Sequence, residues 1–305
     1  MIEDLKAFVT VIDEASLTRA ATALCVTQSA VSKRIQRLEQ YLGADLLDRN
    51  SKPPRPTAVA CRIYEQAVPL LRGLDRLLEL AREDAEPTGT LRFGFPQVVA
   101  EIALFNAVVM TKERFPLLEV RLRTDWSSAL LRTMEQGELD AAVIMVSSDR
   151  TPHEDFSRTF VARLEVLVVQ SRSKPLVEAV NSIKSLASQE WVLNPQGCGY
   201  RAALEAAMDS AGKSLRLGVD THGTDMQLRL VAAGLGLGLV PRGVLENSEW
   251  KDEVSVVEVS DFDLSVDVWL VRPAQLGNLG QAVNFLGESI QASFDGQTSR
   301  GSRPA

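Results

Sequence analysis

Two short helices joined by a tight turn are predicted for residues 16–42, and this stretch limits the fold more than any other. The first helix carries four apolar residues at the spacing of one helix face: Leu17, Ala20, Ala21 and Leu24. The second carries its apolar face on Val31, Ile35, Leu38 and Leu42. Ser16 and Thr27 stand where helix N-caps belong. The two helices are therefore expected to share one small core.

The opposite face of the second helix is polar, and no Asp or Glu occurs between Thr27 and Leu38. Gln can make a paired hydrogen bond with adenine, Ser can bond either base edge, and cations neutralise phosphates. This pattern predicts a helix-turn-helix whose second helix enters the major groove of DNA N-terminus first. The expected contacts begin at Thr27, with base edges read by Gln28, Ser29, Ser32 and Lys33 and phosphates held by Arg34 and Arg37.

Periodicity alone leaves a second interpretation open, an ordinary amphipathic helix pair with a solvated polar face. The residues that follow favour DNA binding. After Leu46 and Leu47, the basic residues Arg49, Lys52 and Arg55 are spaced among prolines. This composition suits a short basic wing that contacts phosphates beside the helix pair.

At this point the chain resembles the N-terminal DNA-binding domain of LysR-type transcriptional regulators. The family pattern is matched at Arg19, Ala20, Ala21, Leu24, Gln28, Ala30, Val31, Ser32, Ile35, Leu38, Glu39, Leu42, Gly43, Leu46 and Arg49. The departures are Leu47 in place of Phe, Lys52 in place of Arg, and residues 56–60, which replace the usual segment after the wing. The resemblance implies a winged helix-turn-helix over 1–57, a linker helix and hinge over 58–88, and an effector-binding domain over 89–305.

The composition fits a multidomain protein of this kind. The 305 residues suffice for a small DNA-binding unit and a large second unit, and 45% of them are hydrophobic. The net charge of -7 is acidic, but DNA affinity needs only a local basic surface, and Lys33, Arg34 and Arg37 are the charged residues within 27–38. No signal peptide or apolar run of membrane length is present, so we expect a soluble, cytoplasmic protein without a membrane partner.

Cysteine and histidine usage argues against a metal centre. The three cysteines Cys25, Cys61 and Cys198 are widely spaced, and the two histidines are too few to complete a metal cluster with them. We therefore expect no metal and no cofactor. Cys198 lies in a glycine-flanked loop and could be a redox-sensing thiol, but no second cysteine is near in sequence, which favours an inert role.

Residues 57–84 are predicted to continue as a helix with one apolar seam. The seam consists of Tyr64, Ala67, Leu71, Leu74, Leu78 and Ala81, and alternating spacings of three and four are typical of a coiled coil. A helix lying on its own domain would show the same spacing. The resemblance favours dimerisation through this helix, with Pro69 as a point of bending or of a missing hydrogen bond.

Strands and helices alternate over the rest of the chain and predict an α/β fold. Strands are expected at 90–95, 119–124, 140–146, 165–171, 191–195, 216–222, 237–241 and 265–271, and helices at 100–115, 127–136, 183–187, 200–211, a segment ending at 234, and 275–292. Residues 295–305 read as a loose tail. Apolar strands between helices indicate a mainly parallel sheet covered on both faces, and the residues do not decide between one sheet and two.

The resemblance implies a bilobal domain like the periplasmic binding proteins, with lobe I over about 90–161 and 266–294 and lobe II over about 162–265. Ligands in such folds bind where strands end and helix N-termini face the crevice. The candidate effector residues at these joints are Pro96, Gln97 and Val98; Trp126, Ser127 and Ser128; Cys198 and Tyr200; and His222 and Thr224.

Two interpretations of these joints stay open. Ordinary turns and caps would explain each residue singly, whereas recurrence at four joints favours a ligand site. An organic acid is one candidate effector, held by backbone amides and Ser127. The other candidate is a less polar effector that contacts Trp126 and Tyr200, because Val98 stands where relatives that bind a carboxylate often have Ser or Thr.

Glycines at 234–238 resemble a phosphate-binding loop, but they precede a strand rather than open a helix, and Gly234 is better interpreted as a helix C-cap.

No catalytic triad or metal signature is recognisable. The sequence thus predicts an effector-switched transcriptional regulator that is not an enzyme. Its expected partners are double-stranded DNA, a small molecule and its own copies in a homodimer or homotetramer, with RNA polymerase left open. The rival is a small-molecule-binding protein or enzyme whose N-terminal helices serve only for pairing.

Overall fold

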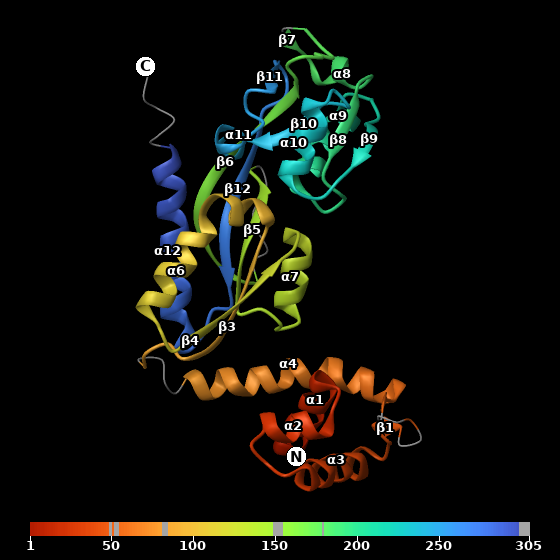
Figure 1. The fold of residues 1–305 in the computed structure, drawn as a ribbon, viewed down its shortest axis with the longest axis vertical. Coiled ribbons are helices and arrows are strands. Elements are labelled where there is room, and N and C mark those ends of the chain that lie inside the picture. The colour runs from red at the N-terminus through yellow and green to blue at the C-terminus, as the bar shows by residue number, and fades with distance from the viewer. Residues whose placement is uncertain (49–50, 52–54, 81–84, 149–154, 179, 299–305) are drawn as a thin grey trace. The chain divides into compact units, whose positions relative to one another are not determined.

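The structure, a computed structural model, describes residues 1–305 except 49–50, 52–54, 81–84, 149–154, 179 and 299–305 (Figure 1). The chain divides into two compact units, one of residues 1–82 with 136–138 and one of residues 83–135 with 139–305. Each unit is described below by itself.

The first unit is a small helical domain with a two-stranded wing. Its elements are α1 (Ile2–Glu14), α2 (Leu17–Ala23), α3 (Gln28–Leu42), β1 (Leu47–Asp48), β2 (Arg55–Pro56) and α4 (Ala58–Leu80). The predicted apolar faces of α2 and α3 meet, because Ala20, Ala21, Val31 and Ile35 are buried together with Ala7 and Val11 of α1. Strands β1 and β2 pair antiparallel, as a wing requires. The predicted winged helix-turn-helix is confirmed.

Local hydrogen bonds cap the N-terminal ends of α2 and α3. The Ser16 hydroxyl accepts a hydrogen bond from the Arg19 amide, and the Thr27 hydroxyl accepts one from the Ala30 amide. Both predicted N-caps are therefore present. Cys25 adopts a left-handed backbone with φ of 52°, which lets the chain reverse between the helices.

One predicted core residue of α3 is wrong. Leu42 is 40% exposed, whereas Glu39 is buried with 8% exposure. Leu42 is the last residue of the helix, and Gly43 with φ of 67° turns the chain away from the core. The Glu39 carboxylate instead accepts hydrogen bonds from the amides of Leu46 (2.9 Å) and Leu47 (3.3 Å), which holds the start of the wing against α3.

Helix α4 runs unbroken from Ala58 to Leu80 with Pro69 inside it. The first residue of the predicted seam, Tyr64, faces α1 of the same chain, and dimerisation through this helix stays a prediction. Tyr64 packs on the cluster around Phe8 and donates its hydroxyl to Asp13. Leu70 and Leu77, which the prediction left off the seam, are 62% and 63% exposed. Leu78 is in the helix but its side chain is not described, and Ala81 lies outside the described residues.

The second unit is an α/β domain with two regions. Its first region contains β3 (Gly89–Phe95), α5 (Gln97–Val99), the π-helical turn η1 (Ala100–Leu104), α6 (Phe105–Arg114), β4 (Leu118–Thr124), α7 (Ser127–Glu135) and β5 (Ala141–Ser147). The chain then continues through β6 (Ser157–Ser171), β7 (Val180–Asn181), α8 (Ile183–Leu186), β8 (Glu190–Leu193), α9 (Gly199–Ser210), β9 (Arg216–Asp220), α10 (Thr224–Ala232), β10 (Gly238–Pro241), α11 (Arg242–Asn247) and β11 (Val254–Val259). It returns through β12 (Leu264–Arg272) and ends on α12 (Leu279–Thr298).

The prediction of a mainly parallel sheet is wrong. Strands β4, β3 and β5 pair in parallel, but β12 is antiparallel to both β5 and β6, and β10 and β11 are antiparallel to β6. The main sheet follows the order β4-β3-β5-β12-β6-β11-β7, with β10 also on β6, and β8 and β9 form a separate parallel pair. The 15 residues of β6 pair antiparallel with β12 along the first part of the strand and with β10 and β11 along the second, which links the two regions.

Other boundaries differ from the prediction in ways that matter for the site. The helix expected from residue 100 begins at Gln97 and passes through η1. β7, α11 and β11 were not predicted, and α12 continues to Thr298, into the expected tail.

Helices α6 and α12 pack together on one side of the sheet and α7 lies on the other (Figure 1). The largest apolar cluster packs α6 and α12 on the sheet and includes Phe93, Leu104, Val268 and Leu286, whereas Leu130 and Met134 of α7 belong to a separate cluster. None of the helices in the described residues is long and apolar enough to span a membrane.

Candidate DNA-reading surface and effector cleft

The N-terminal end of α3 presents polar side chains to solvent. Thr27, Gln28, Ser29 and Lys33 are exposed, and Ser32 is half-buried. The Thr27 and Ser29 hydroxyls lie 3.0 Å apart and share a hydrogen bond. Lys33 forms no ion pair within the part of the chain that the structure describes. These side chains stand on a helix whose other face is anchored in the core by Val31 and Ile35, so their spacing is rigid.

The two predicted phosphate-binding arginines of α3 are paired within the domain. Arg37 Nη2 lies 2.6 Å from Asp4 Oδ1, and Arg34 Nη1 lies 3.4 Å from Glu3 Oε2. Both acids belong to α1, so the absence of acids between Thr27 and Leu38 could not reveal them. Arg55 of β2 is exposed, with its amide held by the Ser51 hydroxyl at 3.0 Å. Arg49 and Lys52 lie outside the described residues.

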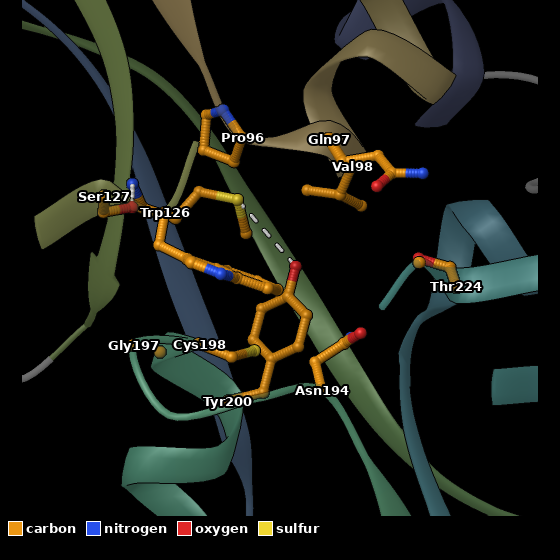
Figure 2. A pocket seen from close by; sticks show the side chains of 13 residues that line it. Pro96, Gln97, Val98, Trp126, Ser127, Asn194, Gly197, Cys198, Tyr200 and Thr224 are labelled. Carbon is orange, nitrogen blue, oxygen red and sulfur yellow. Dashed lines mark hydrogen bonds between the residues drawn. The ribbon is translucent and has the colours of Figure 1, made fainter. Parts of the chain in front are cut away.

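A cleft in the second unit is lined by all four predicted strand-to-helix joints (Figure 2). It holds about 460 Å³ of space not filled by protein atoms, open solvent at its mouth included. Of the ten candidate effector residues, the cleft is lined by Pro96, Gln97, Val98, Trp126, Ser127, Cys198, Tyr200 and Thr224. Ser128 and His222 are not among the lining residues, although the His222 ring lies 6.4 Å from the Trp126 ring.

Five further residues line the cleft: Met145, Asn194, Gly197, Gly199 and Gly223. Asn194, Gly197 and Gly199 lie between the end of β8 and the start of α9, at the same joint as Cys198 and Tyr200. Met145 lies within β5, where nothing in the sequence distinguishes it from its buried neighbours. Gly223 has φ of 87° and faces Gln97 across the cleft: a Cβ there would lie 3.3 Å from Gln97 Nε2. Glycine therefore lets the two sides approach.

Hydrogen bonds fix the orientation of the polar groups in the cleft. The Ser127 hydroxyl accepts a hydrogen bond from the Met145 amide at 2.9 Å. The Tyr200 hydroxyl points at the Met145 sulfur, 3.8 Å away (Figure 2). Burial raises the pKa of Tyr200 well above its usual value, so this group stays a neutral phenol. Tyr200 therefore contributes mainly an apolar ring to the wall.

Asn194 is the one cleft residue with a buried polar atom left without a partner in the described structure. Its Nδ2 donates to Gln227 Oε1 at 3.2 Å, and Gln227 Nε2 donates to the Val192 carbonyl at 2.9 Å. This chain sets the amide orientation, because Gln227 must present Oε1 to Asn194. Asn194 Oδ1 is thereby turned away from Gln227 and has no hydrogen-bond donor, although the residue is only 7% exposed.

The surroundings of Cys198 bear on its two predicted roles, a redox-sensing thiol or an inert cysteine. Cys198 is 4% exposed and stands at the N-cap of α9. Burial raises the pKa of its thiol, and the nearby Arg201 and Tyr200 amides oppose this only in part. A raised pKa disfavours the reactive thiolate. The geometry therefore supports the inert role over redox sensing.

Charge near the cleft is negative. Glu101 of η1 accepts a hydrogen bond from Gln97 Nε2 at 3.2 Å, and desolvation raises the pKa of its carboxyl group despite hydrogen bonds from Gln97 and Thr224. A second hollow adjoins at Thr224 and is lined by Glu101, Asp225 and Glu249 among other residues. Neither hollow has a lysine or arginine among the described residues that line it. In the described residues no group of three or more His, Cys, Asp or Glu side chains is placed to hold a metal ion.

Comparison with protein-family models decides the relationship of the chain. Residues 2–60 match the model of the bacterial regulatory helix-turn-helix proteins of the lysR family, and residues 84–290 match the LysR substrate binding domain. The chain belongs to the LysR family. It is accordingly a LysR-type transcriptional regulator with a helix-turn-helix and a substrate-binding domain, which confirms the resemblance, the fold class and the class of function inferred from the sequence.

Curated LysR-type relatives match over most of their length. The chain is 26% identical over 275 residues to the transcriptional regulator GltR of Bacillus subtilis, covering 89% of this chain and 90% of GltR. It is 26% identical over 245 residues to BenM of Acinetobacter baylyi, covering 79% of this chain and 80% of BenM. Both relatives are named as regulators and not as enzymes.

Solved structures share the fold of this LysR-type chain. Full-length OxyR from Pseudomonas aeruginosa, in a variant form, superposes with a TM-score of 0.72 at 21% identity and covers 95% of this chain and 94% of its own. Full-length CbnR in a complex with its target DNA superposes with a TM-score of 0.62 at 19% identity, covering 95% and 99%. At these identities the likeness establishes the fold.

Proposed function

We propose that this LysR-type regulator reads operator DNA with the N-terminal end of α3 and is switched by a small molecule in the cleft of its second unit. The observation that carries the first part is the exposed front of Gln28, Ser29 and Lys33 on a helix anchored by its other face. A helix presented in this way fits the major groove. CbnR, which shares the fold, is described in complex with target DNA.

The residues proposed for DNA contact divide into two groups. Gln28, Ser29, Ser32 and Lys33 are proposed to meet base edges. Arg55 and the undescribed wing residues Arg49 and Lys52 are proposed to meet phosphates. Arg34 and Arg37 are also proposed for phosphates, but each shares its charge with an acid of α1, so each is expected to contribute less than a free cation.

Switching is proposed to depend on differential affinity. The cleft is lined from one side by the ends of β3 and β4 and from the other by the loops after β8 and β9. A ligand that contacts both sides favours whichever arrangement brings them closest, and in an oligomer this changes how the DNA-binding units are presented. The proposed assembly is a homodimer or homotetramer, because operator reading by a helix-turn-helix usually uses two copies. The proposed compartment is the cytoplasm.

The test of DNA reading is a single substitution with a matched control. Gln28→Ala should weaken binding to DNA from upstream of the protein's own gene by about 1–3 kcal/mol and leave binding to scrambled DNA nearly unchanged, because a base-specific hydrogen bond is lost. Gln40→Ala, on the exposed C-terminal part of the same helix, should leave both unchanged. Fluorescence anisotropy at fixed salt measures both affinities.

Two outcomes would contradict the proposal. Equal weakening by Gln28→Ala on both DNA sequences would remove the base-reading role of Gln28. Failure of the unsubstituted protein to bind its upstream DNA at moderate salt, with oligomers intact, would favour the rival small-molecule-binding protein or enzyme whose N-terminal helices only pair.

A further inference from the structure

We propose that the cleft ligand is a small organic cation, a protonated amine carried on an apolar or aromatic group, and not an organic acid. This inference rests on the proposed effector-binding role of the cleft and names the chemistry of its ligand. It is argued from an unpartnered acceptor, from the charges at the cleft and from the helix N-termini that open on it.

The first observation is the buried acceptor of Asn194. Its Oδ1 has no donor among the described residues, and Figure 2 shows the side chain directed between Tyr200 and Thr224 into the open space. A buried polar atom without a partner costs free energy unless a bound group supplies the missing hydrogen bond. An acceptor needs a donor, and an ionised carboxylate has none. An ammonium group supplies up to three.

The second observation is the balance of charge. Glu101 and Asp225 lie beside the cleft at Thr224, and Glu249 lines the adjoining hollow. Arg201 of α9, which donates to the Asn194 carbonyl, is paired with Glu205 at 2.8 Å and Asp220 at 3.2 Å. A carboxylate ligand would therefore meet like charge without a free cation among the described lining residues, whereas an ammonium ligand would meet opposite charge.

The third observation concerns the helix N-termini, which by themselves would favour an anion. Two of the three longer helices that begin at the cleft carry an acid of the protein at this end. Asp125 accepts the Trp126 amide at the start of α7 at 2.8 Å, and Asp225 lies in the first turn of α10. At the start of α9, Cys198 is the N-cap residue and its side chain makes no capping hydrogen bond. Protein carboxylates therefore already stand at the N-termini of α7 and α10, where they would repel an anionic ligand.

The remaining walls suit the body of such a ligand. Trp126, Val98, Met145 and the Tyr200 ring are apolar surfaces, and an aromatic face attracts a cation within about 6 Å. Val98 offers no side-chain donor for a carboxylate. The desolvated carboxyl group of Glu101, whose pKa is raised, gains more from a nearby cation than a fully hydrated one does.

The experiment uses the full chain and probe compounds that differ only in their head group. The probes are 2-phenylethylamine against 3-phenylpropanoate and 2-phenylethanol, and butylamine against pentanoate. A thermal-shift assay detects binding, since a ligand bound to the folded state raises Tm by mass action. Calorimetry then measures Kd. We expect at least one amine to raise Tm, with its carboxylate partner producing no rise.

Variants test the assigned groups. Asn194→Leu should weaken the amine at least fivefold, because the acceptor is removed. Glu101→Gln, which keeps size and hydrogen bonding, should raise the amine Kd about tenfold. Glu113→Gln on α6 makes the same change of charge at an exposed position away from the cleft and should change nothing. If Asn194→Leu does not fold, Glu101→Gln decides alone.

A rise in Tm with a carboxylate or only with the alcohol, no rise with any amine, or an amine Kd unaffected by Glu101→Gln would overturn the inference. DNA binding by the ligand-free protein, measured in parallel, separates this result from the proposed function. If DNA is bound and only carboxylates stabilise the protein, the inference fails and the regulator stands. If an amine binds and DNA does not, the inference about the ligand stands and the proposed reading of DNA fails.

Discussion

Single residues in the first unit show how a buried charge can organise a wing. Glu39 was matched in the sequence as part of a family pattern, but its physical role lies in two hydrogen bonds to the backbone after α3. Those amides belong to Leu46 and Leu47, which are buried at the junction between helix and wing. The carboxylate therefore gives both of these amides a hydrogen-bond acceptor.

We expect Glu39→Ala to lower the free energy of unfolding by about 1–3 kcal/mol, because two buried amides lose their acceptor. Urea denaturation followed by circular dichroism measures the change. Gln40→Ala, at an exposed neighbouring position, serves as the control and should stay within about 0.5 kcal/mol of the parent. Equal stability of the Glu39 variant and the parent would show that water replaces the carboxylate.

Tyr64 couples α4 to α1 through its hydroxyl group. Burial and the hydrogen bond to Asp13 raise its pKa from 10.0 to about 12. The raised pKa means that folding favours the neutral phenol, so this contribution to stability is complete below pH 10 and is lost as the pH rises toward 12.

The stability difference between the parent and Tyr64→Phe should accordingly be constant from pH 7 to 9 and shrink between pH 10 and about 12. Urea midpoints of both proteins at pH 8, 9, 10 and 11 provide the measurement. Tyr41→Phe, on the exposed end of α3, is the matched control. A difference that does not narrow above pH 10 would show that the hydroxyl group is not held by Asp13.

At the scale of elements, α4 has two faces with different uses. Ala60, Ile63 and Tyr64 pack on α1, whereas Leu70 and Leu77, seven residues apart, stay 62% and 63% exposed. Large apolar side chains in that register are typical of a helix that meets another helix. The spacing in the sequence identified an apolar helix correctly but could not tell which stripe the same domain would cover.

The double substitution Leu70→Ser and Leu77→Ser should convert the proposed dimer to monomer at micromolar concentration, because two helix-contact side chains are lost. Sedimentation velocity measures the mass. Gln66→Ser, exposed one turn earlier on α4, should leave the assembly unchanged. An intact assembly in the double variant would place the subunit contact elsewhere.

Two further elements were decided by long-range pairing. Nothing in the residues of β6 shows that its first half pairs with β12 and its second half with β10 and β11. The antiparallel return of β12 between β5 and β6 brings residues about a hundred positions apart into one register, as with Arg163 and Asp267 at 2.6 Å. Local periodicity predicts a strand but not its neighbour.

For the whole molecule, the sequence determined the modules and the location of the candidate sites. Apolar spacing, caps and the match of residues 19–49 to a family pattern are local properties, so the winged helix-turn-helix and the four cleft joints could be identified without coordinates. Helix N-termini follow strand ends in the chain as they do in space, which is why eight of the ten candidate residues line one cleft.

The tertiary structure alone decided the electrostatics. Arg34 and Arg37 look free in the sequence and meet Glu3 and Asp4 from another helix. The strand-to-helix joints in the sequence suggest a cleft suited to an anion. In the structure, acids of η1 and α10 lie beside the cleft, and the Asn194 side-chain oxygen in it has no hydrogen-bond partner among the described residues. The net charge around a site and the pairing of its hydrogen-bonding groups depend on atoms that only folding brings within a few ångströms of one another. The apolar pattern of a helix or strand, in contrast, depends on the spacing of residues along the sequence.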